Sequence, residues 1–278
     1  MIGSIIGDIV GSIYEFSNIK TKDFPLFSKY CEFTDDSILT VATADWLLNG
    51  GDVAKYYSRY AANHDCPMGG YGSGFRLWVS RTVTDGDFSP YNSCGNGSAM
   101  RVGPVGWLSA NTPSMDETLV LQKAKESAAC THNHPEGIKG AQATALCIYL
   151  ARTGMSVDDI RHRIEKDFGY DLSMRVEELR PRYSWNGLDE AGNGGTCQGS
   201  VSQAIICALD ATDFEDAIRN AISIGGDSDT IGCITGSIAE PLYGIPEDIR
   251  QKGMSYLPSD FKEVIENFEA IFGSDKSR

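Results

Sequence analysis

The chain has 278 residues and a formal net charge of −14 at pH 7, because 38 Asp and Glu outnumber 24 Lys and Arg. Such an acidic chain repels polyanions unless a local patch or a bound cation intervenes, so we expect no sequence-independent nucleic-acid binding. The eight cysteines contain no CxxC pair, and a chain of this length needs no disulfides to fold, which predicts reduced thiols and a cytoplasmic protein.

The chain begins with an apolar run, residues 1–14, that has some features of a signal peptide. It lacks a basic leader and carries Asp8 in its middle, so we predict a buried helix instead. No stretch reaches the roughly 20 apolar residues that a membrane-spanning helix needs. We therefore expect no membrane association.

Helical spacing of apolar residues dominates the rest of the chain, and strand-like alternation is scarce. One run repeats every three to four positions through Ala141, Ala145 and Ile148. Further helices are predicted near 38–48, 52–62, 115–130, 156–168, 200–210, 213–223, 230–240 and 259–272. We predict an all-α fold, a single compact orthogonal helical bundle that forms one domain over 1–278, with a frayed tail at 273–278.

Three loops between these helices are rich in Gly, Asn and Ser, at 66–74, 84–98 and 183–199. Small residues can expose backbone N–H groups to a ligand where bulkier side chains would obstruct it. We predict that these long loops form the walls of a ligand-binding pocket.

Two acidic clusters each precede a predicted helix: TDDS at 34–37 and GGDSDT at 225–230. Helix capping can explain an acid at each helix start, because Thr and Asp side chains accept hydrogen bonds from the free backbone N–H groups there. In the second cluster, the two glycines and alternate carboxylates also suit a backbone that aims its oxygens at one point.

Taken together, the clusters can supply four carboxylates and two hydroxyls. This all-oxygen set suits hard ions such as Mg²⁺, Mn²⁺ or Ca²⁺ and disfavours zinc. If the clusters meet in space, their summed negative charge would require cations.

These motifs resemble the paired metal motifs of the ADP-ribosylglycohydrolases, in the same order and at a similar separation. Further blocks are similar to that family, namely GSIIGDIVGSIYEF, YGSG, SCGNGSAMRVGP, THNHPEG and GNGGTCQGSVSQAI. The resemblance extends from about residue 3 to residue 245. It implies an all-α enzyme that removes ADP-ribose from a modified target.

The resemblance also implies a set of site residues. Two divalent cations, Mg²⁺ or Mn²⁺, would be coordinated by Thr34, Asp35, Asp36, Asp227, Asp229 and Thr230. The catalytic residues would be Glu15, which gates the pocket or assists proton transfer, and Asp35 or Asp36, which receives a proton from water. The substrate-binding residues would be Gly72, Ser93, Gly95, Asn96, Gly97, Ser98, Met100 and His132.

Several of these positions have more than one interpretation. The small residues of 93–98 can present N–H donors to a pyrophosphate or can form a simple turn. Arg101 can offset phosphate charge or pair with a structural acid. We disfavour a metal site at His132 and His134, since the resemblance places His132 beside the distal ribose or phosphate, and His134 can cap the helix that begins at Pro135.

The expected reaction is hydrolysis of the bond between ADP-ribose and a protein side chain such as Arg or Ser, or of a small ADP-ribose ester. The cations would hold the ribose hydroxyls and activate a water molecule. Glu15 and the 183–199 loop would select the linkage. Two alternatives stay open: an inactive ADP-ribose-binding or structural relative, and a binuclear-metal nucleotide phosphohydrolase. We expect a monomer that acts on ADP-ribosylated protein.

Overall fold

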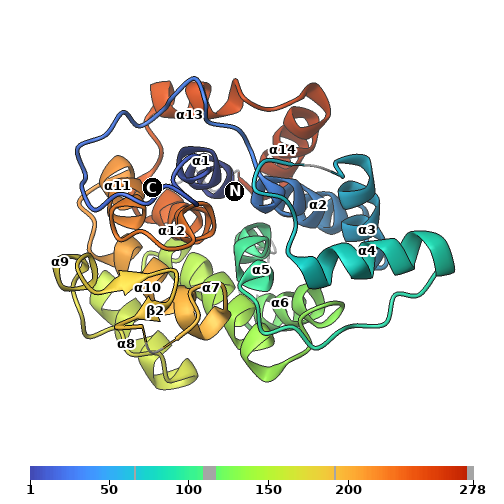
Figure 1. The fold of residues 1–278 in the computed structure, drawn as a ribbon, viewed down its shortest axis with the longest axis horizontal. Coiled ribbons are helices and arrows are strands. Elements are labelled where there is room, and N and C mark those ends of the chain that lie inside the picture. The colour runs from blue at the N-terminus through green and yellow to red at the C-terminus, as the bar shows by residue number, and fades with distance from the viewer. Residues whose placement is uncertain (66, 109–116, 191, 274–278) are drawn as a thin grey trace.

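Two helices in direct backbone contact form the centre of the molecule. The computed structural model describes residues 1–65, 67–108, 117–190 and 192–273. In it, α1 (Ile2–Gly11) lies beside α12 (Ser228–Tyr243), and the other helices surround this pair (Figure 1). Every residue of α1 is buried, which agrees with the buried helix predicted for the apolar start of the chain.

Glycines allow the two central helices to approach each other this closely. Gly3 and Gly7 lie four residues apart, so they share one face of α1, opposite Gly236 and Gly232 of α12. A Cβ atom added at Gly7 would lie 1.9 Å from the carbonyl oxygen of Gly232, and one added at Gly236 would lie 2.0 Å from the carbonyl oxygen of Gly3. Any side chain at these positions would therefore force the helices apart.

The remaining helices form a shell around this pair. They are α2 (Asp35–Asn49), α3 (Val53–Asn63), α4 (Ser73–Asp85), α5 (Gly97–Met100), the 3₁₀ helix η1 (Gly103–Trp107), α6 (Glu117–Ala129), α7 (Pro135–Arg152), α8 (Val157–Phe168), α9 (Val176–Leu179), α10 (Cys197–Leu209), α11 (Phe214–Ser223), α13 (Glu247–Met254) and α14 (Ser259–Phe272). Within the described ranges the one sheet is a hairpin, β1 (Tyr183–Ser184) with β2 (Gly187–Leu188). The predicted all-α bundle is confirmed.

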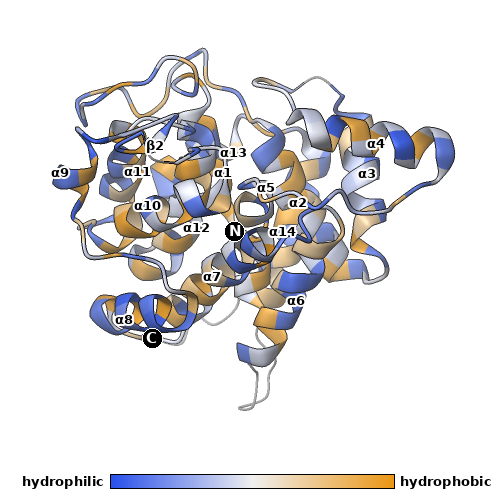
Figure 2. Ribbon diagram, turned by 60° about the horizontal axis from the view of Figure 1, so that its bottom comes forward, coloured by the Kyte–Doolittle hydropathy of each residue, from blue (hydrophilic) through white to orange (hydrophobic). Residues whose placement is uncertain are grey.

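Several peripheral helices bury one face, as the mixed colours of α8 in Figure 2 illustrate. Besides the short helices α5, η1 and α9, two longer ones, α4 and α13, were not predicted. In α4 the buried residues are Phe75, Trp78 and Thr82, while Leu77 is 69% exposed, so apolar residues lie on both faces and blur the helical pattern. In α13 the buried positions are Ile249 and Gly253, which give almost no apolar signal.

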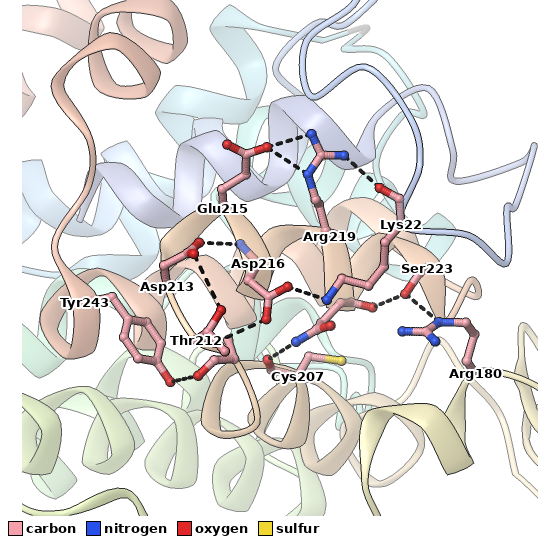
Figure 3. Close-up of polar contacts among 12 residues, drawn as sticks. Lys22, Arg180, Cys207, Thr212, Asp213, Glu215, Asp216, Arg219, Ser223 and Tyr243 are labelled. Atoms are coloured by element: carbon pink, nitrogen blue, oxygen red, sulfur yellow. Dashed lines mark hydrogen bonds and ion pairs between the residues drawn. The ribbon is translucent and has the colours of Figure 1, made fainter.

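A polar network fixes the long connection between α1 and α2 to the outer face of α11. Lys22 forms an ion pair with Asp216. Arg219 donates a hydrogen bond of 2.8 Å to the carbonyl oxygen of Lys22 (Figure 3) and one of 2.7 Å to that of Phe24. Because the connection also carries Glu15, these contacts help to hold that residue in place.

Other predictions meet the structure only in part. The frayed tail expected at 273–278 lies, apart from Gly273, outside the described residues, as does Cys66. The seven cysteines that are described are free, as expected. Within the described ranges, no helix combines the length and the apolarity needed to cross a bilayer. The single-domain organisation stays a prediction.

The contact between α1 and α12 can be tested by adding one methyl group. We expect Gly7→Ala to lower the free energy of unfolding by about 3 kcal/mol, because the new Cβ would overlap the Gly232 carbonyl group. Gly72→Ala is the matched control, since φ is −53° there and a Cβ would contact no neighbouring atom. Urea denaturation of both variants measures the difference, and equal stability would contradict this packing.

Candidate active site

The two acidic clusters meet at one cavity of about 420 Å³. The first lies at the beginning of α2 and the second at the beginning of α12. The cavity wall includes Asp35 and Asp36 from the first cluster and Asp227, Asp229 and Thr230 from the second. The spatial meeting of the clusters, which the metal hypothesis requires, is therefore present in the structure.

The carboxylates approach one another closely without a basic partner. Oxygens of Glu15, Asp227 and Asp229 lie within 4.8 Å of one another, in a group that could hold a metal ion. The Thr230 hydroxyl lies 3.4 Å from Asp36 Oδ2, whereas the buried Asp36 Oδ1 has no hydrogen-bond partner. In the described parts of the chain, none of these acids forms an ion pair with Lys, Arg or His.

Burial, together with this crowding, raises the pKa of every acid in the cluster. Burial, with the charges of Asp229 and Asp8, raises the pKa of Glu15 to about 8. Burial raises the pKa of Asp227 to about 6. The pKa values of Asp35 and Asp36 rise well above the ordinary range, through burial and then through the charge of Asp229. Ionising all of these groups together is unfavourable unless cations are bound.

Asp8 is a site residue that the sequence analysis missed. This buried residue of α1 accepts hydrogen bonds from the backbone N–H groups of Thr34 and Ser37, at 2.9 and 3.1 Å, and from both of their hydroxyls. Burial still raises the pKa of Asp8 to about 6. In the sequence, Asp8 is recognisable only as a charged residue within an apolar run. Its role depends on hydrogen bonds to the beginning of α2, and the sequence does not reveal that this segment lies beside α1.

Capping explains part of the first cluster but not the second. The Thr34 hydroxyl accepts a hydrogen bond of 3.2 Å from the Asp36 N–H group as the N-cap of α2, and it donates one of 2.6 Å to Asp8. Thr34 is buried and does not line the cavity. Asp227 stands at the N-cap position of α12 but its side chain does not cap the helix.

Two of the predicted glycine-rich loops form the opposite wall. The backbone N–H groups of Asn96 and Cys197 donate to the carbonyl oxygens of Gly195 and Cys94, at 3.1 and 3.0 Å, so the 84–98 and 183–199 loops pair side by side. The Asn96 side chain donates a hydrogen bond of 2.7 Å to Asp227. This wall is therefore attached directly to the acidic cluster.

The predicted substrate-binding residues divide into two groups. Seven line the cavity: Gly72, Ser93, Gly95, Asn96, Gly97, Met100 and His132. Ser98 does not, because it is fully buried and its hydroxyl donates to the Gly137 carbonyl oxygen at 2.7 Å. His134 is the N-cap of α7 and accepts a hydrogen bond from the Glu136 N–H group, as expected for a capping residue.

Aromatic side chains complete the wall, and the sequence analysis did not single them out. Tyr71, Phe75, Tyr91 and Trp185 all line the cavity. Three of them belong to the loops predicted as pocket walls, so loop membership was the signal that could have found them. Trp185 donates a hydrogen bond of 2.7 Å to the Glu15 carbonyl oxygen. It therefore holds the backbone of Glu15 at the cavity.

Glycine at position 69 makes room for the Glu15 carboxylate. Gly69 has φ of +75°, and a Cβ atom there would lie 2.6 Å from Glu15 Oε2. That oxygen is buried and has no hydrogen-bond partner among the residues that the structure describes. The Glu15 carboxylate is thus enclosed beside the acidic cluster rather than exposed at the end of the first helix.

Comparison with known proteins relates this cavity to an enzyme family. A family model described as ADP-ribosylglycohydrolase matches residues 1–275. The chain belongs to the ADP-ribosylglycohydrolase family. As an ADP-ribosylglycohydrolase, it is a glycosyl hydrolase that acts on ADP-ribosyl groups.

Relatives of this ADP-ribosylglycohydrolase match along most of their length. ADP-ribosylhydrolase ARH3 of Bos taurus is 26% identical, over 94% of this chain and 89% of its own. ADP-ribosylarginine hydrolase Tri1 of Pseudomonas putida is 24% identical, over 88% of this chain and 70% of its own. A solved structure titled ADP-ribosylglycohydrolase-related protein complex shares the fold, with a TM-score of 0.70, 23% identity, and coverage of 98% of this chain and 95% of that one.

Without bound metal, this ADP-ribosylglycohydrolase should become less stable as the pH rises. The pKa values rise on folding, for Asp8 from 3.8 to about 6 and for Glu15 from 4.5 to about 8. The folded protein therefore binds more protons than the unfolded chain across this range. The free energy of unfolding should then fall as pH rises, by about 1.4 kcal/mol per pH unit for each proton of difference.

Urea denaturation in a chelator, at several pH values between about 5 and 8, measures this slope. Saturating Mg²⁺ should flatten it, because a bound cation favours the ionised carboxylates. A stability that increases with pH in the chelator would contradict the crowding of these acids.

Proposed function

We propose that the enzyme hydrolyses the glycosidic bond between ADP-ribose and a modified target, using two divalent cations, Mg²⁺ or Mn²⁺. The convergence of the two acidic clusters carries this proposal. Carboxylates without a basic partner, one of them with a buried oxygen that has no hydrogen bond, fit a site for hard cations. A monomer in the cytoplasm that acts on ADP-ribosylated protein is the setting we propose.

The cations would be held by the side chains of both clusters. Asp227, Asp229 and Thr230 would supply oxygens from the start of α12, and Asp35 and Asp36 from the start of α2. Thr34 would contribute its hydroxyl oxygen, whose proton is directed to Asp8. When bound, such cations polarise hydroxyl groups and lower the pKa of water.

The protein's own acids would then move the protons. Asp35 or Asp36 would accept a proton from the attacking water, and both line the cavity, where Asp36 lies 3.4 Å from the Thr230 hydroxyl. Glu15 would gate the pocket or donate a proton at the bond that breaks. Its raised pKa, about 8 in the metal-free protein, allows it to carry a proton near neutral pH.

The opposite wall would bind the rest of the substrate. The Gly95 and Gly97 backbone can approach phosphate oxygens closely because neither residue has a side chain. The His132 imidazole lies next to both glycines, since a Cβ atom added at Gly97 or Gly95 would lie 3.2 or 3.5 Å from Nε2. The rings of Tyr71 and Phe75 offer apolar surface within the same cavity.

Replacing one acid in each cluster tests the centre. We expect Asp36→Asn and Asp229→Asn each to lower kcat at least about 1,000-fold in saturating Mg²⁺, because each removes a charged oxygen ligand. Asp85→Asn is the matched control, since Asp85 is exposed at the far end of α4. Calorimetric titration with Mn²⁺ should show weaker binding by the two cluster variants. Turnover and metal binding like those of the control would refute the assignment.

Product analysis separates the proposed reaction from the alternatives. We expect free ADP-ribose from at least one of ADP-ribosylarginine, ADP-ribosylserine and O-acetyl-ADP-ribose, in the presence of Mg²⁺ or Mn²⁺ and not with a chelator. Inorganic phosphate or AMP would instead identify a phosphohydrolase. Binding of ADP-ribose without any product would identify an inactive relative.

A further inference from the structure

A buried arginine lines the cavity together with His132. Arg101 is 0% exposed, and the structure gives it no ion pair within the described residues. Its guanidinium group stacks over the Tyr57 ring, 4.0 Å from the ring centre, and donates a hydrogen bond of 2.8 Å to the Ser127 carbonyl oxygen near the end of α6. The structural acid that the sequence left open as a partner is not found there.

The same guanidinium group begins a chain of hydrogen bonds that reaches the cavity. Arg101 Nη2 lies 2.8 Å from the Thr131 hydroxyl, and that hydroxyl lies 2.8 Å from His132 Nδ1. All three side chains are buried. The three groups therefore form one continuous chain of contacts from the Arg101 guanidinium group to the His132 imidazole.

The chemistry of the first donor fixes the direction of the first contact. A guanidinium group can only donate, so the Thr131 oxygen accepts from Arg101. The hydroxyl hydrogen is then free to point to His132 Nδ1, which accepts it when that nitrogen carries no proton. If Nδ1 carried the proton instead, the hydroxyl would receive two donors and its own hydrogen would lack this acceptor.

The other imidazole nitrogen faces the glycine-rich loop. A Cβ atom added at Gly97 or Gly95 would lie 3.2 or 3.5 Å from His132 Nε2. No hydrogen bond to Nε2 is found in the described part of the chain. A proton on Nε2 is thus directed at the place where the proposed function puts the phosphate oxygens.

We propose that Arg101 and Thr131 are positioning residues that fix His132 as a neutral imidazole with its proton on Nε2, a ready donor to a substrate phosphate oxygen. This inference rests on the proposed function for its ligand but not for the tautomer itself. Burial, and then the charge of Arg101, hold the pKa of His132 well below its ordinary value, in agreement with a neutral ring.

Nitrogen NMR of the free protein tests the tautomer directly. We expect the His132 signals of the wild-type chain, identified by their loss in His132→Gln, to show a protonated Nε2 and an unprotonated Nδ1 at neutral pH. In Thr131→Val, which keeps the side-chain shape but lacks the hydroxyl, the two tautomers should both be populated. A protonated Nδ1 in the wild-type chain, or an unchanged tautomer in Thr131→Val, would overturn the proposal.

Calorimetry with ADP-ribose tests the consequence. We expect Thr131→Val to bind ADP-ribose about tenfold more weakly, whereas Thr131→Ser, which keeps the hydroxyl, should bind like the wild type. Adenosine, which lacks phosphate, should bind all three proteins equally. A loss shared by adenosine, or by Thr131→Ser, would mean a structural defect and refute the positioning role. Failure of the wild type to bind ADP-ribose would refute the proposed function alone, since the NMR result stands without a ligand.

Discussion

The site depends on the backbone contact between α1 and α12. Because Gly3 and Gly7 meet Gly236 and Gly232 without intervening side chains, the two helices lie closer than ordinary side chains would allow. The same closeness continues at Gly11, where a Cβ atom would lie 2.5 Å from the Asp229 Cα. The acidic turn before α12 is thereby held against the end of α1.

Asp8 connects this pair of helices to α2, the third helix of the site. It extends from α1 to Thr34 and Ser37, and so fixes the beginning of α2 relative to α12. Both helices direct their N-termini at the carboxylates, and the partial positive charge there offsets some of the repulsion between the acids. The rest must be offset by bound cations or by protons, which explains why the metal-free protein is expected to respond to pH.

Much of the architecture could be predicted from the sequence, because strong apolar periodicity marks the buried helices. The helix predicted over 38–48, which in the structure extends from Asp35 to Asn49, and the buried first helix are examples. Where the apolar pattern is weak, as in α4, prediction failed. The sequence also indicated the ligand types of the acidic clusters, but the role of Asp8 could not be recognised, since it acts through residues far away in the chain. Ser98 shows the reverse case: it lies in a recognisable motif, yet its hydroxyl is turned to Gly137.

The hydrogen bond from Asn96 to Asp227 joins the two ends of the cavity. A cation bound to the Asp227 carboxylate would draw electron density from the oxygen that accepts this hydrogen bond. The strength of the bond from the Asn96 amide, and with it the position of the 84–98 loop, would then depend on the cation. By thermodynamic reciprocity, ions at one end and a nucleotide at the other then influence each other's affinity to the same degree.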